Sequence, residues 1–406
     1  IQRPHLLTTR RVRRFVAALA IALCGCGDAW RPPRPIIEDS RAVTAIDRCA
    51  ECHQDIVARF AESSHLRTLA RARPGTVAER FAGRSIQLSD GTQFTFRFEG
   101  DTLVCDTSCA AAPVPLHWIF GSGHHAQTPL ATWPDELGRL ESTEWRVSWY
   151  PDGDLGSTLG FEGKDLGERS GPLCMGNPQD RFQTRQCFAC HSTLVPERDG
   201  VIDQSGIVPG VSCSRCHFEA VGHATAQQNG GDRDPIEKWS DLSPSEAIGR
   251  CGECHRRADQ FTPQELTPSN RLLVRFAPVG LELSACFRSQ TSPSADGSAP
   301  GSASAAKGKS RPTAALVCTS CHDPHAPQQF DRARALRVCH RCHVQGEDDD
   351  CPAEPATSDC LRCHMPKVAI HPKLRFTDHW IRVHRERPRT PPAAVLHRPA
   401  GAASIP

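Results

Sequence analysis

The amino-acid sequence predicts a mainly α and coil chain with a small β-meander near residues 86–104, and three observations lead to this expectation. Only 38% of the 406 residues are hydrophobic and 6% are aromatic, which is lean for a chain of this length. Short motifs and loops interrupt most of the chain, so that only short helices are expected, such as 54–72 and 244–258. Clear alternation of apolar residues occurs in one stretch alone.

That stretch contains Phe94, Phe96 and Phe98 at every second position. Asp90-Gly91 precedes these residues and Glu99-Gly100-Asp101 follows them, and both are typical turn sequences. Alternation between two turns predicts a small antiparallel meander, the single strand region that we expect.

The most informative pattern is Cys-x-x-Cys-His, which occurs seven times in a chain with 21 cysteines. Random placement would give far fewer than one match. In a helical turn the thiols at positions i and i+3 fall on one face and can add to two haem vinyl groups, and the His at i+4 then meets the iron. Zinc knuckles and thiol redox pairs also use Cys-x-x-Cys, but the His that follows every pair favours haem.

We therefore expect seven haem c groups in a haem-stacked multihaem cytochrome. Each macrocycle is a large apolar plate, so seven of them would complete a core that the side chains alone leave small. The predicted thioether cysteines are Cys49, Cys52, Cys187, Cys190, Cys213, Cys216, Cys251, Cys254, Cys318, Cys321, Cys339, Cys342, Cys360 and Cys363. The predicted proximal iron ligands are His53, His191, His217, His255, His322, His343 and His364.

The sixth ligand of each iron must come from elsewhere in the chain. Met175 and Met365 are the only methionines, so a second His is the expected ligand at most irons. The candidate distal ligands are His65, His124, His125, His223, His325, His371, His379 and His384. We expect one of the adjacent pair His124 and His125 to ligate, and at least one of the last three, with His379 favoured. Four further histidines have no supporting context and are interpreted as non-ligands: His5, His117, His340 and His397.

The cysteines outside the motifs have other expected roles. Cys105 and Cys109 are close enough in sequence to form a local disulfide in an oxidising compartment. Cys174, Cys286 and Cys351 have no assigned partner and are expected to be small buried hydrophobic residues.

The N-terminus predicts export. Four arginines between residues 10 and 14 precede a short apolar run, 15–23, that is too short to span a bilayer. The Leu23-Cys24-Gly25-Cys26 ending resembles a bacterial lipobox, with Cys26 as the lipidation candidate; ordinary cleavage or a retained anchor are the alternatives. The expected product is a periplasmic or membrane-anchored lipoprotein of a bacterium.

Charge disfavours nucleic acid as a partner. The net charge of the full chain is +2, and loss of residues 1–25 removes five arginines and no acidic residue, which lowers it to −3. Haem propionates lower it further. The 42 arginines, against six lysines, are interpreted as propionate partners and as surface charge.

Composition divides the chain into six segments. After the signal and lipobox, 1–26, a Pro- and Arg-rich tether is expected at 27–45, and a low-complexity Ser, Gly, Ala and Pro linker at 289–313. The linker separates an N-terminal haem domain, 46–288, with haems 1 to 4, from a C-terminal haem domain, 314–386, with haems 5 to 7. The last three motifs recur every 21 residues, which indicates a repeated unit, and a disordered tail is expected at 387–406.

Four stretches together resemble the cytochrome c-552/c-554 superfamily. They are 49–65, the Ile-Phe-Gly-Ser-Gly-His segment from Ile119, the third motif with His223, and the last motif with the Met-Pro-Lys that follows it and Asp378-His379. The similarity covers roughly residues 46–385 and implies a mostly helical, haem-stacked body that transfers electrons or acts on nitrogen or sulfur oxyanions. The tetrahaem cytochrome of that group has four motifs rather than seven, and the chain lacks the Cys-x-x-Cys-Lys motif of the related pentahaem nitrite reductases.

Two functions are therefore weighed. The leading hypothesis is a seven-haem electron carrier in a bacterial respiratory chain, with a quinol-linked donor and a terminal reductase or oxidase as redox partners, and no catalytic residue. The alternative is a multihaem reductase that binds a small nitrogen or sulfur compound at one five-coordinate haem. A structural subunit of a larger respiratory complex is a third class, which would need a permanent partner surface.

Overall fold

Antiparallel sheets are a major part of the structure, a computed structural model that describes residues 37–162, 171–231, 234–291, 316–327, 330–343 and 359–384. About 36% of these residues are helical and about 23% lie in strands. The expectation of a mainly α and coil chain is therefore wrong. All of the described residues belong to one structural unit.

The larger sheet has five strands in the order β1-β6-β7-β8-β11, and every pair is antiparallel. Its strands are β1 (Leu69–Arg71), β6 (Trp118–Phe120), β7 (Thr128–Pro134), β8 (Leu140–Trp145) and β11 (Gly176–Gln179). Sequence reasoning missed this sheet because apolar and polar residues do not alternate along its strands. Thr132, Ser142 and Thr143 are buried within it, so both faces are covered and no polar face marks the strands.

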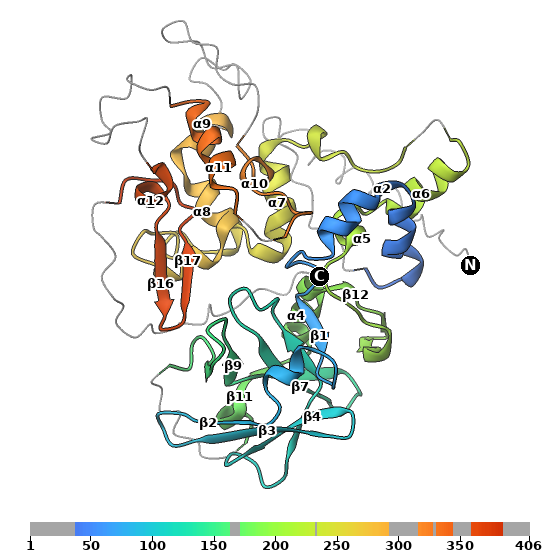
Figure 1. Ribbon diagram of the computed structural model, residues 1–406, viewed down its shortest axis with the longest axis vertical. Helices are drawn as coiled ribbons and strands as arrows, with labels where there is room; N and C mark the ends of the chain where they lie inside the picture. The colour runs from blue at the N-terminus through green and yellow to red at the C-terminus, as the bar shows by residue number, and fades with distance from the viewer. Residues whose placement is uncertain are drawn as a thin grey trace, which may run out of the picture. The chain divides into compact units, whose positions relative to one another are not determined.

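The second sheet contains the predicted meander. Its order is β2-β3-β4-β5, and Figure 1 shows β2, β3 and β4 as neighbouring arrows. The strands are β2 (Arg84–Gln87), β3 (Gln93–Glu99), β4 (Thr102–Thr107) and β5 (Val114–Leu116). The turns between them contain Gly91 and Gly100, both with positive φ, as the turn sequences predicted. The meander is present, with a fourth strand beyond the predicted range.

The main apolar core lies between these two sheets. Phe94, Phe96 and Leu103 from the four-stranded sheet pack in one cluster with Ile119 and Trp145 from the five-stranded sheet. All five side chains are fully buried. This part of the chain thus forms a protein core from its own side chains.

Four two-stranded pairs complete the strand structure. They are β9 (Val147–Trp149) with β10 (Leu155–Ser157), β12 (Ser192–Leu194) with β15 (Val208–Pro209), β13 (Glu197–Arg198) with β14 (Val201–Ile202), and β16 (Lys367–His371) with β17 (Leu374–Thr377).

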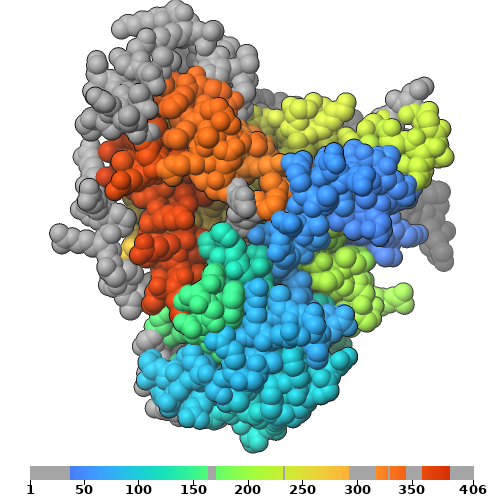
Figure 2. Space-filling model, in the orientation of Figure 1, coloured from blue at the N-terminus to red at the C-terminus, as the bar shows by residue number. Residues whose placement is uncertain are grey.

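The helices are short, as expected. They are α2 (Ile46–Phe60), α3 (Pro172–Met175), α4 (Arg181–His191), α5 (Cys213–Cys216), α6 (Ala220–Gln228), α7 (Pro244–His255), α8 (Ala277–Leu283), α9 (Ala285–Thr291), α10 (Cys318–Cys321), α11 (Arg332–His340) and α12 (Cys360–His364). Capping boxes fix two of the starts: Asp180 with Gln183 at α4, and Ser243 with Glu246 at α7. The orange and red surfaces in Figure 2 belong to the segment from α10 onward, in which α11 contacts both α10 and α12.

The helix predicted over 54–72 ends early, at Phe60. The Ser63 hydroxyl accepts from the backbone N–H of His65 at 3.2 Å, and the Thr68 hydroxyl donates to the His65 carbonyl at 3.1 Å. Such local hydrogen bonds compete with helix formation, so the chain turns and enters β1. The second predicted helix, 244–258, is α7 and ends at His255, because Arg256 has a positive φ of 67°.

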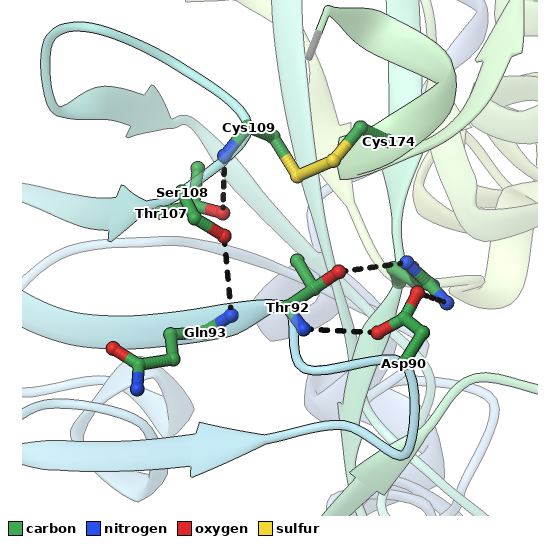
Figure 3. The surroundings of a disulfide bond; sticks show 8 residues. Asp90, Thr92, Gln93, Thr107, Ser108, Cys109 and Cys174 are labelled. Atoms are coloured by element: carbon green, nitrogen blue, oxygen red, sulfur yellow. Dashed lines mark hydrogen bonds and ion pairs between the residues drawn. A yellow bond between two sulfur atoms is a disulfide. The ribbon is translucent and has the colours of Figure 1, made fainter. Parts of the chain in front are cut away.

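The predicted disulfide is also wrong. Cys109 pairs with Cys174 of α3, with a Cα–Cα distance of 5.6 Å, rather than with Cys105 (Figure 3). Cys105 is fully buried as a free thiol, and burial raises its pKa to about 12. Sequence proximity favoured the local pair, but Cys105 lies in the pleat of β4 and faces the core. The disulfide ties the end of the meander to the residues that lead into β11.

The Cys109–Cys174 bridge closes a 65-residue separation, so its removal should destabilise the sheet region. In the chain-entropy treatment a loop of this length is worth about 4 kcal/mol. Urea unfolding of the Cys109→Ser/Cys174→Ser variant, followed by circular dichroism of the strands, should show a loss of this order. Cys105→Ser is the control and should leave the bridge formed; equal stability of wild type and double variant would contradict the expectation.

A buried ion pair fixes the turn between β2 and β3. Asp90 accepts from the backbone N–H of Thr92 at 3.0 Å and from Nη2 of Arg146 at 2.6 Å, and Figure 3 shows the Asp90–Thr92 contact. The side chains of Arg146 and Asp90 are 2% and 11% exposed. Burial opposes the charged carboxylate, but the hydrogen bonds from Thr92 and Arg146 outweigh it and lower the pKa of Asp90 to about 2.

This pKa predicts the acid sensitivity of the sheets. Because the pKa of Asp90 in the folded protein lies below the ordinary value of 3.8, the carboxylate stabilises the fold above about pH 4, and this contribution, up to about 2 kcal/mol, is lost as the pH falls through 2. Asp90→Asn should remove it at pH 7 and flatten the pH dependence of unfolding. The exposed Asp106, paired with Arg97, provides the control Asp106→Asn. An unchanged pH profile in Asp90→Asn would refute the assignment.

Several predictions fall outside the described residues: the signal and lipobox, 1–26, the tail beyond 384, Cys351, and most of the linker. The predicted tether is described from Ile37, whose side chain is buried and whose carbonyl accepts from the N–H of Val195 at 2.9 Å. The packed body therefore begins before Ala45. Among the described helices, none has the length and apolar content needed to cross a bilayer.

Candidate functional site: paired histidines around helical cysteine motifs

All seven motifs lie on short helical turns. Motif one is inside α2, motifs two and four end α4 and α7, motifs three, five and seven occupy α5, α10 and α12, and motif six begins in α11. The backbone N–H of the motif His donates to the carbonyl of the first Cys in motifs three, five and six, at 2.7, 3.0 and 3.0 Å. These i to i+4 bonds put both thiols and the imidazole on one side of the turn, as thioether attachment requires.

The disulfide of the described chain joins Cys109 and Cys174, which belong to no motif. The fold therefore separates structural cysteines from motif cysteines, and the donor set fits covalent haem.

Four motif histidines each face a second histidine at nearly the same distance. The ring centres are 6.2 Å apart for His53 and His223, 6.2 Å for His255 and His65, 6.1 Å for His217 and His325, and 6.2 Å for His322 and His379. With a metal–nitrogen bond of about 2 Å on each side, two axial imidazoles have ring centres about 6 Å apart. The gaps thus fit one iron each.

The fold delivers the four distal rings through local structure. His65 lies in the turn after α2, and His223 lies in the first turn of α6, where Asp234 bonds its Nδ1 at 2.8 Å. The Asp323 carboxylate accepts from the backbone N–H of His325 at 3.0 Å. Nδ1 of His379 lies 3.0 Å from the Thr377 carbonyl. Partners at Nδ1 orient a ring and leave Nε2 for a metal.

Burial keeps two rings of these pairs, one motif His and one distal His, neutral. It lowers the pKa of His255 and of His379 to about 4, with nearby histidines adding to the effect. Burial also lowers the pKa of His65 and His322. A neutral imidazole is the form that binds iron, so these rings are ready to ligate at neutral pH.

The other motif histidines have different surroundings. The ring of His191 packs against Phe120, with centres 4.9 Å apart, and its Nδ1 lies 3.1 Å from the Thr68 carbonyl. Nδ1 of His364 lies 3.1 Å from the Arg382 carbonyl, and Nε2 of His384 approaches the His364 carbonyl at 3.3 Å. His384 is therefore near motif seven, as the sequence predicted.

Three predicted distal ligands have other neighbours. His124 and His125 contact each other at 4.6 Å, and His125 packs on Phe376 of β17 at 4.3 Å. His371 does not fit the prediction of a haem ligand, because both of its nitrogens are engaged. Its Nε2 contacts the Ser157 carbonyl and Glu162 at 3.0 and 3.1 Å, and its Nδ1 accepts from the N–H of Lys373.

The surroundings of motifs four and five contain little apolar core. The clusters around α7 to α10 and around β16 have three buried members each, whereas the cluster between the sheets has sixteen and the cluster that includes Phe188 of motif two has eight. Haem plates would supply the missing apolar mass. This distribution fits the lean composition of the chain.

Sequence reasoning missed one residue that fits haem. Arg215, inside motif three, is 7% exposed; its Nη1 lies 3.7 Å from a Glu253 carboxylate oxygen, and its Nε has no hydrogen-bond partner among the described residues. A buried guanidinium with unused donors suits a propionate. The excess of arginine over lysine was the only signal in the sequence.

Comparisons with known proteins agree with this site. The family described as cytochrome c554 and c-prime matches residues 172–218, which contain motifs two and three. The crystal structure of outer cell wall cytochrome OcwA is similar at 15% identity and a TM-score of 0.31, a likeness too low to support an argument. It covers 53% of this chain, which spans 37% of the length of that protein. No curated protein matches. The family match supports a multihaem c-type cytochrome that binds haem c and transfers electrons.

Proposed function

We propose that the chain is a seven-haem cytochrome that carries electrons in a bacterial respiratory chain. Bound haem supplies one-electron redox chemistry, and the residues of the chain attach it, ligate it and exclude water from it. Seven complete motifs on helical turns support the count of seven. The proposed partners are a quinol-linked donor and a terminal reductase or oxidase.

The observation that carries this proposal is the set of four imidazole pairs at 6.1–6.2 Å. An iron with an imidazole on both faces has no open position for a substrate. Such sites exchange electrons without forming or breaking substrate bonds, which favours a carrier over a catalyst.

The pairs also bring the motifs close together. His223 follows motif three but faces the His of motif one, His325 follows motif five but faces the His of motif three, and His379 follows motif seven but faces the His of motif five. His65 of the first motif region faces the His of motif four. Each ligand pair thus ties two motif segments together, and neighbouring segments keep redox centres close.

A second function is favoured by one observation. Phe120 rather than a second imidazole packs against His191, so the second motif is the best place for a five-coordinate iron. Such an iron would bind a small nitrogen or sulfur compound, and the chain would then be a reductase.

The N-terminal sequence supports export, with lipid attachment at Cys26. We propose that the protein is a periplasmic or membrane-anchored lipoprotein of a bacterium, placed where redox partners would dock.

Haem content and spin state test the proposed function together. The intact mass of the haem-loaded protein should correspond to seven attached haems, and low-temperature electron paramagnetic resonance of the oxidised protein should show low-spin ferric signals. A high-spin signal that shifts with nitrite or hydroxylamine would replace the carrier by the reductase. A mass with fewer haems would refute the count.

The His217–His325 pair provides a sharper test, because its rings are almost parallel, at 5°. His325→Ala should convert about one haem in seven to high spin without loss of covalent attachment, since Cys213 and Cys216 are unchanged. Electron paramagnetic resonance and mass on one preparation measure both effects. The control is His340→Ala, an exposed His within motif six. An unchanged spectrum in His325→Ala would remove His325 from the ligands.

A further inference from the structure

A buried ion pair joins two of the haem motifs. Arg215 is the second residue between the cysteines of motif three, and Glu253 has the same place in motif four. Nη1 of Arg215 lies 3.7 Å from Oε2 of Glu253, and the two side chains are 7% and 6% exposed. Neither side chain belongs to the attachment chemistry, yet the pair lies where two attachment turns meet.

Motif two also lies beside Glu253. Sγ of Cys190 approaches the backbone carbonyl of Glu253 at 4.0 Å. The attachment turn of motif two therefore lies beside that of motif four.

The charges around Glu253 come from a small network. Arg250, one turn earlier in α7, contacts Glu253 at 3.3 Å and Glu237 at 2.9 Å, and is 9% exposed. The charge of Glu253 is also among the causes that raise the pKa of Arg257. Two arginines and two glutamates in direct contact nearly cancel, so removing one leaves an uncompensated charge in a region of low solvent access.

We infer that the Arg215–Glu253 pair is the junction at which the haems of motifs two, three and four meet, and that its charges set their reduction potentials. This inference rests on the proposed function, because it assumes haem at these three motifs. Reduction adds one negative charge to a haem, so a positive side chain favours the reduced form and a negative one favours the oxidised form. Screening by solvent is weak at a buried site, so the effect of each charge is large there, and because Coulomb energy falls with distance the nearest haems shift most.

The inference makes Arg215 and Glu253 positioning residues with opposite electrostatic effects. Glu253→Gln should move about three sevenths of the haem absorbance change to higher potential, and Arg215→Gln should move the same fraction to lower potential. Arg215→Gln/Glu253→Gln, which removes both charges, should return the curve close to that of the wild type. A potentiometric titration followed by optical absorbance measures all four proteins.

Asp106→Asn is the matched control, since it breaks the Arg97 ion pair of the four-stranded sheet and changes the charge by the same amount away from the motifs. Its titration should follow that of the wild type. If Arg215→Gln fails to assemble, Arg250→Gln replaces it, because loss of that positive charge should lower the same potentials.

Three results would overturn the inference: shifts of the same sign in Glu253→Gln and Arg215→Gln, shifts spread over all haems, or no shift. These results are separate from failure of the proposed function, which would appear in the wild type as a haem mass below seven. If the wild type carries seven low-spin haems and the variants have the same titration curves as the wild type, the inference about the Arg215–Glu253 pair is refuted and the proposed function is not.

Discussion

The close facing of imidazole rings from segments distant in the chain is the constraint on which the proposed haem sites depend. A Cys-x-x-Cys-His turn fixes one ligand by covalent geometry, but the opposite ligand must be brought from another segment to within one iron's width. The fold does this four times, at 6.1–6.2 Å between ring centres. The turn after α2, the start of α6 and the approach to His379 are shaped by that requirement, with hydrogen bonds that hold each distal ring or its backbone.

The same constraint divides the apolar core. Between the two sheets, Phe94, Phe96 and Trp145 pack as in an ordinary protein interior, and the Cys109–Cys174 bridge closes the region. Around motifs four and five, and around β16, the clusters of buried apolar side chains are small. One part of the chain can therefore be stable through its own side chains, while the other depends on haem for its apolar contacts.

Local patterns predicted the local parts of this arrangement. The spacing of the motifs predicted the helical turns, and the contexts of His65, His223, His325 and His379 were sufficient to select them as candidate ligands. Their partners lay beyond prediction, because each pair joins segments that are distant in the chain. The five-stranded sheet was missed for a physical reason as well: Thr132, Ser142 and Thr143 are buried in it, and alternation disappears when both faces are covered.

The order of motifs along the chain is not their order in space. Motif one shares a ligand pair with the segment after motif three, and a buried hydrogen bond of 2.9 Å runs from the Thr44 N–H to the Ser214 hydroxyl within motif three. Motifs two and four meet through Cys190 and the Glu253 carbonyl. An electron that moves between nearest neighbours would therefore not follow the sequence. The buried charges of Arg215 and Glu253 lie where three motifs converge, which is where a change in potential would have the widest effect on such a route.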